Sequence, residues 1–392
     1  MPSFYVGQNG RAPRLDSSIK IFRRLTQAIE LTGDSCLVVI RELHKIGYSV
    51  MAKSRVLVVG TGGIGTVSAY ALESGGKAEV TAVMRSNYDA AVQNGIDIDS
   101  VQYGQIKAWR PTAITKTVPD VSKGDVAPFD YILVTTKNIA DVPPTVAEII
   151  APAVTPGKTA IVLSQNGINI EKPLIPRFPT NPLISSVAYT GATETALAKI
   201  YNDDPDCQKI GAFVSPQVPT EVANEAAKRY VSIYNPEGKL DVIYEPDVPK
   251  VRWRKIAYNG SFNPVASILR MDTPRMRMSQ HIIDDVILPI VAEIRAIAQA
   301  NGVTLQADLI DAIMHQDPND TAFKPSMCQD FEKGNLMEIE NLVGEPLREA
   351  EKLGIPAPNL RMVYGIMKGL QLKVKEEKGL WKPKFEPGNP YV

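Results

Sequence analysis

Three polar residues with helical spacing stand out in the second half of the chain. Lys255, Asn259 and Asn263 occupy positions i, i+4 and i+8, so on a helix they form one polar stripe beside Trp253 and Phe262. A lysine among aromatic side chains is partly desolvated, which lowers the pKa of its amine and makes it a usable proton donor. Taken alone, the stripe fits a surface lysine with two bridging amides equally well.

A further polar segment follows nearer the C-terminus. Ser326 belongs to the run Lys-Pro-Ser-Met-Cys-Gln-Asp at residues 324–330, and Glu338 lies near the start of a helix expected over residues 336–353. A carboxylate there complements the helix dipole, so the position indicates a stabilising helix end as readily as a ligand contact. Pro346 inside the same segment predicts a kink or a boundary near residues 344–345.

The spacing of glycines early in the chain indicates nucleotide binding. The residues Gly60, Thr61, Gly62, Gly63, Ile64 and Gly65 directly follow a run of β-branched residues at 56–59 and open a helical stretch. This G-x-G-x-x-G spacing allows a tight turn, close approach of a pyrophosphate to the backbone, and close packing of the helix on the strand. Because the strand and the helix are both present, we favour a dinucleotide site over a merely structural turn.

The residues after the second expected strand, at 79–84, bear on which dinucleotide binds. An enzyme that uses NAD commonly has an acid here for the ribose hydroxyls, but this chain has Met-Arg-Ser-Asn at residues 84–87. Arg85 suits the extra 2′-phosphate of NADP, and Ser86 offers a second donor. We therefore expect NADPH, with a solvated loop arginine as the alternative.

The pattern of elements around these residues predicts two domains. Strand-like runs at residues 56–59, 79–84, 131–135, 160–163 and 183–187 alternate with helical stretches, which predicts a Rossmann-type, doubly wound parallel sheet. Long helical patterns follow at 252–269, 281–301, 336–353 and 359–375 and predict an all-helical C-terminal domain. We expect an N-terminal extension over residues 1–50, a nucleotide-binding domain over 51–246, a helical domain over 247–375 and a tail over 376–392.

Composition restricts the class of partner. The 43 basic and 43 acidic residues balance, so the chain lacks the positive field that gathers nucleic acid or anionic membrane, and a small-molecule partner is favoured. The three cysteines are far apart and no histidine has a metal-ligand setting, so we expect a reducing compartment and no metal. No apolar run is long enough to cross a bilayer. The chain is expected to be cytoplasmic, and a homodimer remains open.

Residues 1–50 allow two interpretations. They are rich in arginine and contain few early acids, which fits a mitochondrial transit peptide. A surface helix or an incorrect gene start is the alternative, because Met51 directly precedes the first strand.

In their order along the chain, these motifs resemble the ketopantoate reductase (2-dehydropantoate 2-reductase) family over residues 55–369. The glycine loop and Arg85 are followed by a Thr-Lys ending at Lys137 and an Asn-Gly beginning at Asn166. A Trp-x-Lys-x-x-x-Asn-x-x-x-Asn-Pro segment contains Lys255, and a Ser-Met-x-x-Asp segment precedes Glu-Ile-Glu at 338–340.

The resemblance implies an NADPH-dependent oxidoreductase with its active site between the two domains. Its reaction is the reduction of ketopantoate to pantoate, on the route to pantothenate and coenzyme A. Lys255 and Glu338 would be the catalytic residues, with Lys255 as the general acid. Lys137 and Asn166 would line the cofactor side, and the substrate would be held by Glu338 with Asn259, Asn263 and Ser326.

Two departures from the family pattern leave the identity of the keto acid open. Residues 196–211 are longer and more acidic than in compact members, and residues 269–273 lack an expected asparagine; we expect both segments to border the substrate. A related reductase of another 2-keto acid or a secondary metabolite is the alternative. An NADPH sensor without chemistry is disfavoured, because a sensor needs neither a proton donor nor a keto-acid clamp.

Overall fold

The computed structural model describes residues 52–385 and 387–391. The chain divides into the units Met1–Lys53 and Ser54–Val392, and all that follows concerns the second. The expected N-terminal extension therefore lies outside the described residues.

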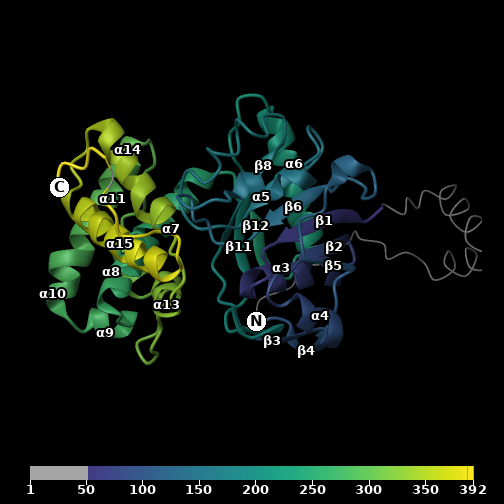
Figure 1. The fold of residues 1–392 in the computed structure, drawn as a ribbon, viewed down its shortest axis with the longest axis horizontal. Coiled ribbons are helices and arrows are strands. Elements are labelled where there is room, and N and C mark those ends of the chain that lie inside the picture. Colours follow the sequence, from purple (N-terminus) through teal and green to yellow (C-terminus); the bar gives the residue numbers. More distant parts are fainter. Residues whose placement is uncertain (1–51, 386, 392) are drawn as a thin grey trace, which may run out of the picture. The chain divides into compact units, whose positions relative to one another are not determined.

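The first part of this unit is built on an eight-stranded sheet (Figure 1). The strand order is β12-β11-β8-β7-β6-β1-β2-β5, and every neighbouring pair is parallel except β8 with β11. The predicted doubly wound parallel sheet is thus confirmed, with one antiparallel pair. The strands are β1 Ser54–Val59, β2 Ala78–Val83, β5 Ala113–Thr115, β6 Tyr131–Val134, β7 Ala160–Leu163, β8 Leu183–Ala188, β11 Cys207–Ala212 and β12 Asp241–Tyr244.

Alternating residues of the strands are buried on opposite faces of this sheet. Val56 and Val58 pack in one cluster with residues of α3 (Gly63–Ser74) and α6 (Thr220–Tyr234). Leu57 and its neighbours pack on the other face with α5 (Val146–Ile150) and the short turn η2 (Ala151–Ala153). Burial on both faces explains the nearly continuous apolar runs that made these strands recognisable. The chain leaves β1 toward β2 and returns to β6 on the other side, so the winding direction reverses between β1 and β6.

A second, four-stranded sheet was not predicted. Its order is β4-β3-β10-β9, and its residues Ile98 and Ile200 pack with Val67 of α3. The sheet joins segments about a hundred residues apart, and its strand β4 is half-buried to exposed, so no apolar run marks it. The elements are β3 Ile96–Ser100, β4 Gly104–Trp109, β9 Thr193–Ala196 and β10 Lys199–Asn202, with helix α4 Tyr88–Asn94 and turn η1 Val121–Lys123 elsewhere in this part.

The acidic segment at residues 203–206 ends in a buried carboxylate. Asp206 is 1% exposed and accepts hydrogen bonds from Tyr103 Oη at 2.8 Å, Tyr234 Oη at 2.7 Å and Gln208 Nε2 at 2.9 Å. These contacts tie the small sheet to α6 and the large sheet. The expectation that the segment borders the substrate is therefore wrong for Asp206, because its oxygens already bind core residues.

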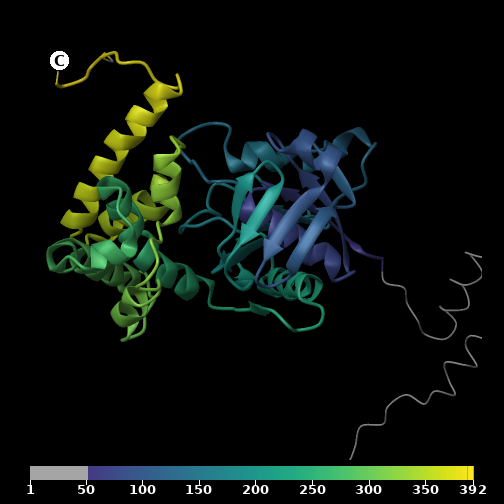
Figure 2. The ribbon, with the colours of Figure 1, turned by 90° about the horizontal axis from the view of Figure 1, so that it is seen from below.

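After β12 the described chain is helical, which confirms the predicted all-helical region (Figures 1 and 2). A single apolar core holds these helices together. None of the helices among the described residues is long and apolar enough to cross a membrane. The domain boundaries remain predictions. The elements are α7 Val248–Asn259, α8 Phe262–Leu269, α9 Thr273–Arg277, α10 Gln280–Ile282, η3 Ile283–Ile287, α11 Leu288–Ala300, α12 Leu309–Met314, α13 Ser326–Glu332, η4 Glu340–Gly344, α14 Glu345–Leu353 and α15 Pro358–Glu377.

Two of the expected helices differ in the structure. The helix predicted over residues 252–269 is broken between Asn259 and Phe262, because Pro264 has no N–H for the carbonyl of Gly260. The helix predicted from residue 336 begins only after Glu338, and its first turn is the π-helical η4. Near Pro346 the chain stays helical, but the π-helical η4 changes to α14 at Glu345 with the proline in its first turn, so the expected boundary is a change of helix type rather than a helix end.

Candidate active site

The glycine loop connects β1 to α3, and each glycine of the motif has its own surroundings. Gly60 has φ +100°, and a Cβ there would lie 2.6 Å from the backbone nitrogen of Thr136. A Cβ on Gly65 would lie 1.9 Å from the carbonyl oxygen of Gly60, whereas one on Gly62 would meet nothing within 4 Å. The first and last glycines thus permit the turn and the helix packing, and Gly62 leaves open space beside the backbone.

The N-terminus of α3 is suited to an anion. Gly62 is its N-cap residue, has no side-chain cap, and no acidic residue occupies the first turn. The first backbone N–H groups are therefore left for a ligand, and the helix dipole favours negative charge. Since the loop lies where the winding of the sheet reverses between β1 and β6, the geometry fits the pyrophosphate of a dinucleotide.

The hairpin of β9 and β10 holds the loop from one side. A Cβ on Gly63 would lie 2.0 Å from the carbonyl oxygen of Ala192, so this contact needs a glycine. Asn87 Nδ2 donates to the carbonyl of Thr61 at 2.9 Å and to Glu194 Oε1 at 3.1 Å. The Thr61 hydroxyl donates to the carbonyl of Val83, so its proton is not available to a phosphate of the cofactor. Ile64, also predicted to contact the cofactor, is half-buried in the first turn of α3.

Arg85 lies on the exposed loop between β2 and α4. Its guanidinium makes no hydrogen bond or ion pair within residues 52–385, and Ser86 beside it is also exposed. The side chain is free to meet a phosphate, although its role stays a prediction.

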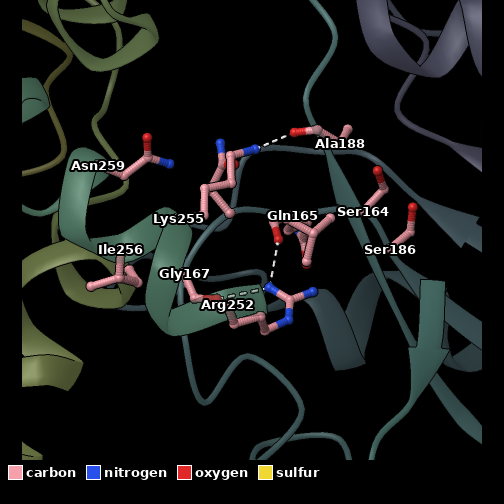
Figure 3. Close-up of a pocket in the computed structure, with 11 residues that line it drawn as sticks. Ser164, Gln165, Gly167, Ser186, Ala188, Arg252, Lys255, Ile256 and Asn259 are labelled. Carbon is pink, nitrogen blue, oxygen red and sulfur yellow. Dashed lines mark hydrogen bonds between the residues drawn. The ribbon is translucent and has the colours of Figure 1, made fainter. Parts of the chain in front are cut away.

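Lys255, on α7, meets the carboxyl end of β8. Its amine donates to the carbonyl of Ala188 and lies 5.2 Å from the centre of the Tyr189 ring (Figure 3). Burial, and after it the positive charge of Arg252, lower the pKa of Lys255 to about 8. A lowered pKa was expected from desolvation beside Trp253 and Phe262, but the ring recorded next to the amine is that of Tyr189.

A small cavity brings three of the predicted residues together. Lys255 and Asn259 line it from α7, and Asn166 lines it from the loop that follows β7. Gln165 in the same loop donates from Nε2 to the carbonyl of Thr136 at 2.7 Å, and its Oε1 has no partner among the described residues. The cavity therefore joins a proton donor, two amides and an unpaired acceptor at the carboxyl edge of the sheet.

Lys137 and Glu338 form a contact between the sheet and the helical region. The Lys137 ammonium lies 2.6 Å from Asp330 and 3.7 Å from Glu338, which also accepts from the backbone N–H of Asn138 at 2.9 Å. Burial alone would lower the pKa of Lys137, but the two carboxylates outweigh it and raise that pKa. Glu338 does not line the cavity, yet its charge acts on Lys255 and opposes the lowering of its pKa.

The remaining predicted substrate residues lie outside the cavity lining. Asn263 is on α8, beyond the break after α7, and is 2% exposed with no partner for Oδ1 among the described residues. Ser326 is exposed at the first position of α13. The prediction that Lys255, Asn259 and Asn263 form one stripe on a single helix is thus wrong, because the break after α7 puts Asn263 on the next helix. No cluster of metal-ligating side chains occurs within the described residues.

Sequence reasoning missed Arg252. This residue is 4% exposed and donates four hydrogen bonds around the loop that contains Asn166. Its position one turn before Lys255 was visible in the sequence, but nothing in the pattern distinguished a buried arginine from a surface one.

Together, the glycine loop at the reversal of the sheet and the half-buried lysine define a dinucleotide-dependent oxidoreductase site. Two family models match the chain: "Ketopantoate reductase PanE/ApbA" over residues 56–215 and "Ketopantoate reductase PanE/ApbA C terminal" over residues 247–371. The chain belongs to the ketopantoate reductase family, whose members are oxidoreductases that bind NAD(P)H.

Individual proteins resemble this chain over most of its length. An uncharacterized protein of Saccharomyces cerevisiae (strain ATCC 204508 / S288c) is 36% identical over 350 residues, which cover 84% of this chain and 97% of the relative. The crystal structure of 2-dehydropantoate 2-reductase from Methylococcus capsulatus is 29% identical, with a TM-score of 0.69, and covers 82% of this chain and 97% of that one. A ternary structure of D-mandelate dehydrogenase with NADH and anilino(oxo)acetate shares the fold at 17% identity, with a TM-score of 0.68 and coverage of 82% and 99%.

The glycine loop yields a paired prediction. Gly62→Ala should leave the free energy of unfolding nearly unchanged, because its Cβ meets open space, but should weaken NAD(P)H binding about tenfold or more by obstructing the pyrophosphate. Gly65→Ala should instead lower the free energy of unfolding by about 1–3 kcal/mol, because its Cβ overlaps the carbonyl of Gly60.

Urea denaturation and cofactor fluorescence titration measure the two effects separately. Equal cofactor affinity in wild type and Gly62→Ala would contradict the placement of the pyrophosphate at this loop.

Proposed function

We propose that the chain reduces a 2-keto acid with NADPH, and that ketopantoate is that acid, giving pantoate. The observation that carries the proposal is Lys255, an amine with a pKa lowered to about 8 beside Asn166 and Asn259 at the carboxyl edge of the sheet. Family membership supports the reaction class. The similarity of this chain to the 2-dehydropantoate 2-reductase from Methylococcus capsulatus supports ketopantoate as the substrate.

The proposed chemistry needs one proton donor from the chain. When bound, NADPH supplies a hydride to the keto carbon, and the carbonyl oxygen becomes an alkoxide. The Lys255 ammonium stabilises this oxygen and then donates its proton, so that keto acid, NADPH and one proton give the 2-hydroxy acid and NADP⁺. A donor with a pKa near 8 is mostly protonated at neutral pH and still acidic enough to transfer its proton.

The other predicted residues receive roles by position. Asn166 and Lys137 follow β7 and β6 at the edge that carries the glycine loop, so we assign them to the cofactor side. Asn259 is one turn from Lys255 and is assigned to the substrate. Asn263, whose buried Oδ1 has no partner among the described residues, Ser326 and Glu338 complete the proposed substrate contacts.

The segment at residues 269–273 favours a second class of substrate. Two of the three polar side chains here are already engaged: Asp272 caps α9 and pairs with Arg275, and the Thr273 hydroxyl donates to Asp317 at 2.7 Å. The third, Arg270, lies 4.9 Å from the centre of the Phe331 ring. Where the family pattern has an asparagine, this chain therefore offers no unpaired polar group from Asp272 and Thr273. A 2-keto acid with fewer polar groups than ketopantoate is the second candidate.

Kinetics with a panel of 2-keto acids test the proposal. We expect the purified full chain to oxidise NADPH with ketopantoate at a kcat/KM about tenfold or more above those for pyruvate, 2-ketoisovalerate and phenylglyoxylate. Lys255→Ala should lower kcat about 100-fold or more while NADPH still binds.

The panel separates the alternatives. Turnover with another keto acid but not with ketopantoate would favour the second candidate, and NADPH binding without turnover of any acid would indicate a sensor. Unchanged kcat in Lys255→Ala would remove Lys255 from the mechanism.

The preference for NADPH is tested at Arg85. Arg85→Ala should raise the Kd for NADPH about tenfold and leave the Kd for NADH nearly unchanged, because only NADPH has the 2′-phosphate that a guanidinium can bind. Calorimetric titration of both cofactors measures this. An equal loss for both would place the 2′-phosphate elsewhere.

A further inference from the structure

Arg252 directs a buried guanidinium at the backbone that surrounds Asn166. Nη1 donates to the carbonyls of Gln165 at 3.0 Å and Gly167 at 2.7 Å, and Nη2 donates to that of Leu163 at 3.2 Å. Nε donates to Ser185 Oγ at 2.8 Å on the neighbouring strand β8. Figure 3 shows Arg252 on α7 reaching the loop from below Lys255.

Such a charge would be costly to bury without compensation. Within the described residues Arg252 makes no ion pair, and it lies 5.0 Å from the centre of the Phe213 ring. Burial lowers the pKa of Arg252 to about 10, while the charge of Glu171 opposes the shift. Three carbonyl dipoles, one hydroxyl and an aromatic face therefore replace water around a guanidinium that stays positively charged at neutral pH.

These contacts hold together two parts of the site, the loop that carries Asn166 and the helix that carries Lys255, whose relative position the proposed reaction requires. The carbonyls of Gln165 and Gly167 flank Asn166 directly. Gly167 has φ +105°, and Asn341 leaves no space there for a side chain. Lys255 is three residues after Arg252 on α7, and Asn259 follows one turn later. One planar side chain thus connects the loop carrying Asn166 to the helix carrying the proton donor.

Arg252 also contributes to the electrostatics around Lys255. After burial, its positive charge is the factor that lowers the pKa of Lys255, against opposing contributions from Glu338, before η4, and Cys207, on β11. The Tyr189 ring, which follows β8, faces the same amine.

We propose that Arg252 is a positioning residue for the keto-acid reduction: it fixes the loop of Asn166 against α7 and supplies positive charge beside Lys255. This rests on the proposed role of Lys255 as the acid. Arg252 also lines the small cavity, but its guanidinium is already engaged with three backbone carbonyls and the Ser185 hydroxyl, so we assign its effect to Asn166 and Lys255.

The test uses Arg252→Met in the full chain and measures the titration of Lys255 without substrate. The pH dependence of acetic anhydride labelling at Lys255, followed by mass spectrometry, should show its midpoint moved upward from about 8, because a positive charge is gone. In the same variant kcat should fall about tenfold or more, with the Kd for NADPH nearly unchanged.

Lys250→Met is the matched control, because it removes a positive charge from an exposed position of the same helix. It should leave the Lys255 titration and kcat close to wild type. An unchanged titration midpoint and kcat in Arg252→Met would overturn the proposal, as would an equal shift in the control.

A second variant keeps the test informative if Arg252→Met does not fold. Arg252→Lys retains a cation but not the planar fork that reaches three carbonyls, so kcat should still fall about tenfold. Full activity in Arg252→Lys would refute the positioning role. Because labelling does not depend on turnover, an upward shift in Arg252→Met together with full activity of Lys255→Ala would reject the proposed acid rather than the contact.

Discussion

The partial burial of one lysine ammonium at the edge of a parallel sheet is the constraint that organises the site. Removing an ammonium from water disfavours its charged form, and the structure lowers the pKa of Lys255 to about 8 without neutralising it. In place of water, the carbonyl of Ala188 and the ring of Tyr189 stabilise the charged amine of Lys255. The helix α7, which carries this lysine, starts four residues after β12 ends.

The helical region is held to this edge by charged contacts around the site. Lys137 binds Asp330 and lies near Glu338, and Lys368 of α15 binds both Asp141 and Glu340, with distances of 2.8 Å and 2.7 Å. Asp141 and Lys137 lie on the stretch that follows β6, close to the glycine loop in the order of the sheet. The same contacts thus connect the nucleotide-binding edge to the residue segment that includes Glu338.

Local signals explain which features the sequence predicted. Gly60 and Gly65 each have a steric reason for lacking a side chain, Gly62 leaves open space beside the backbone, and the buried strands around them are apolar on both faces. The small sheet depends on pairing between distant strands such as β3 and β10, which no local pattern records. Pro264 indicates a break after α7, but the apolar helical pattern on both sides of it predicts one continuous helix. The burial of Arg252 depends on carbonyls nearly ninety residues earlier, so it was not predictable from its neighbours.

The central claim is that Lys255 delivers the proton as an ammonium, and the pH dependence of kcat/KM for the keto acid tests it most directly. The protonated form is the active one and its pKa is about 8, so kcat/KM should be constant below that pH and fall about tenfold per pH unit above it. Lys255→Ala should retain a low kcat/KM without this decline. A wild-type profile that stays level well above pH 8, or the same decline in Lys255→Ala, would contradict the account.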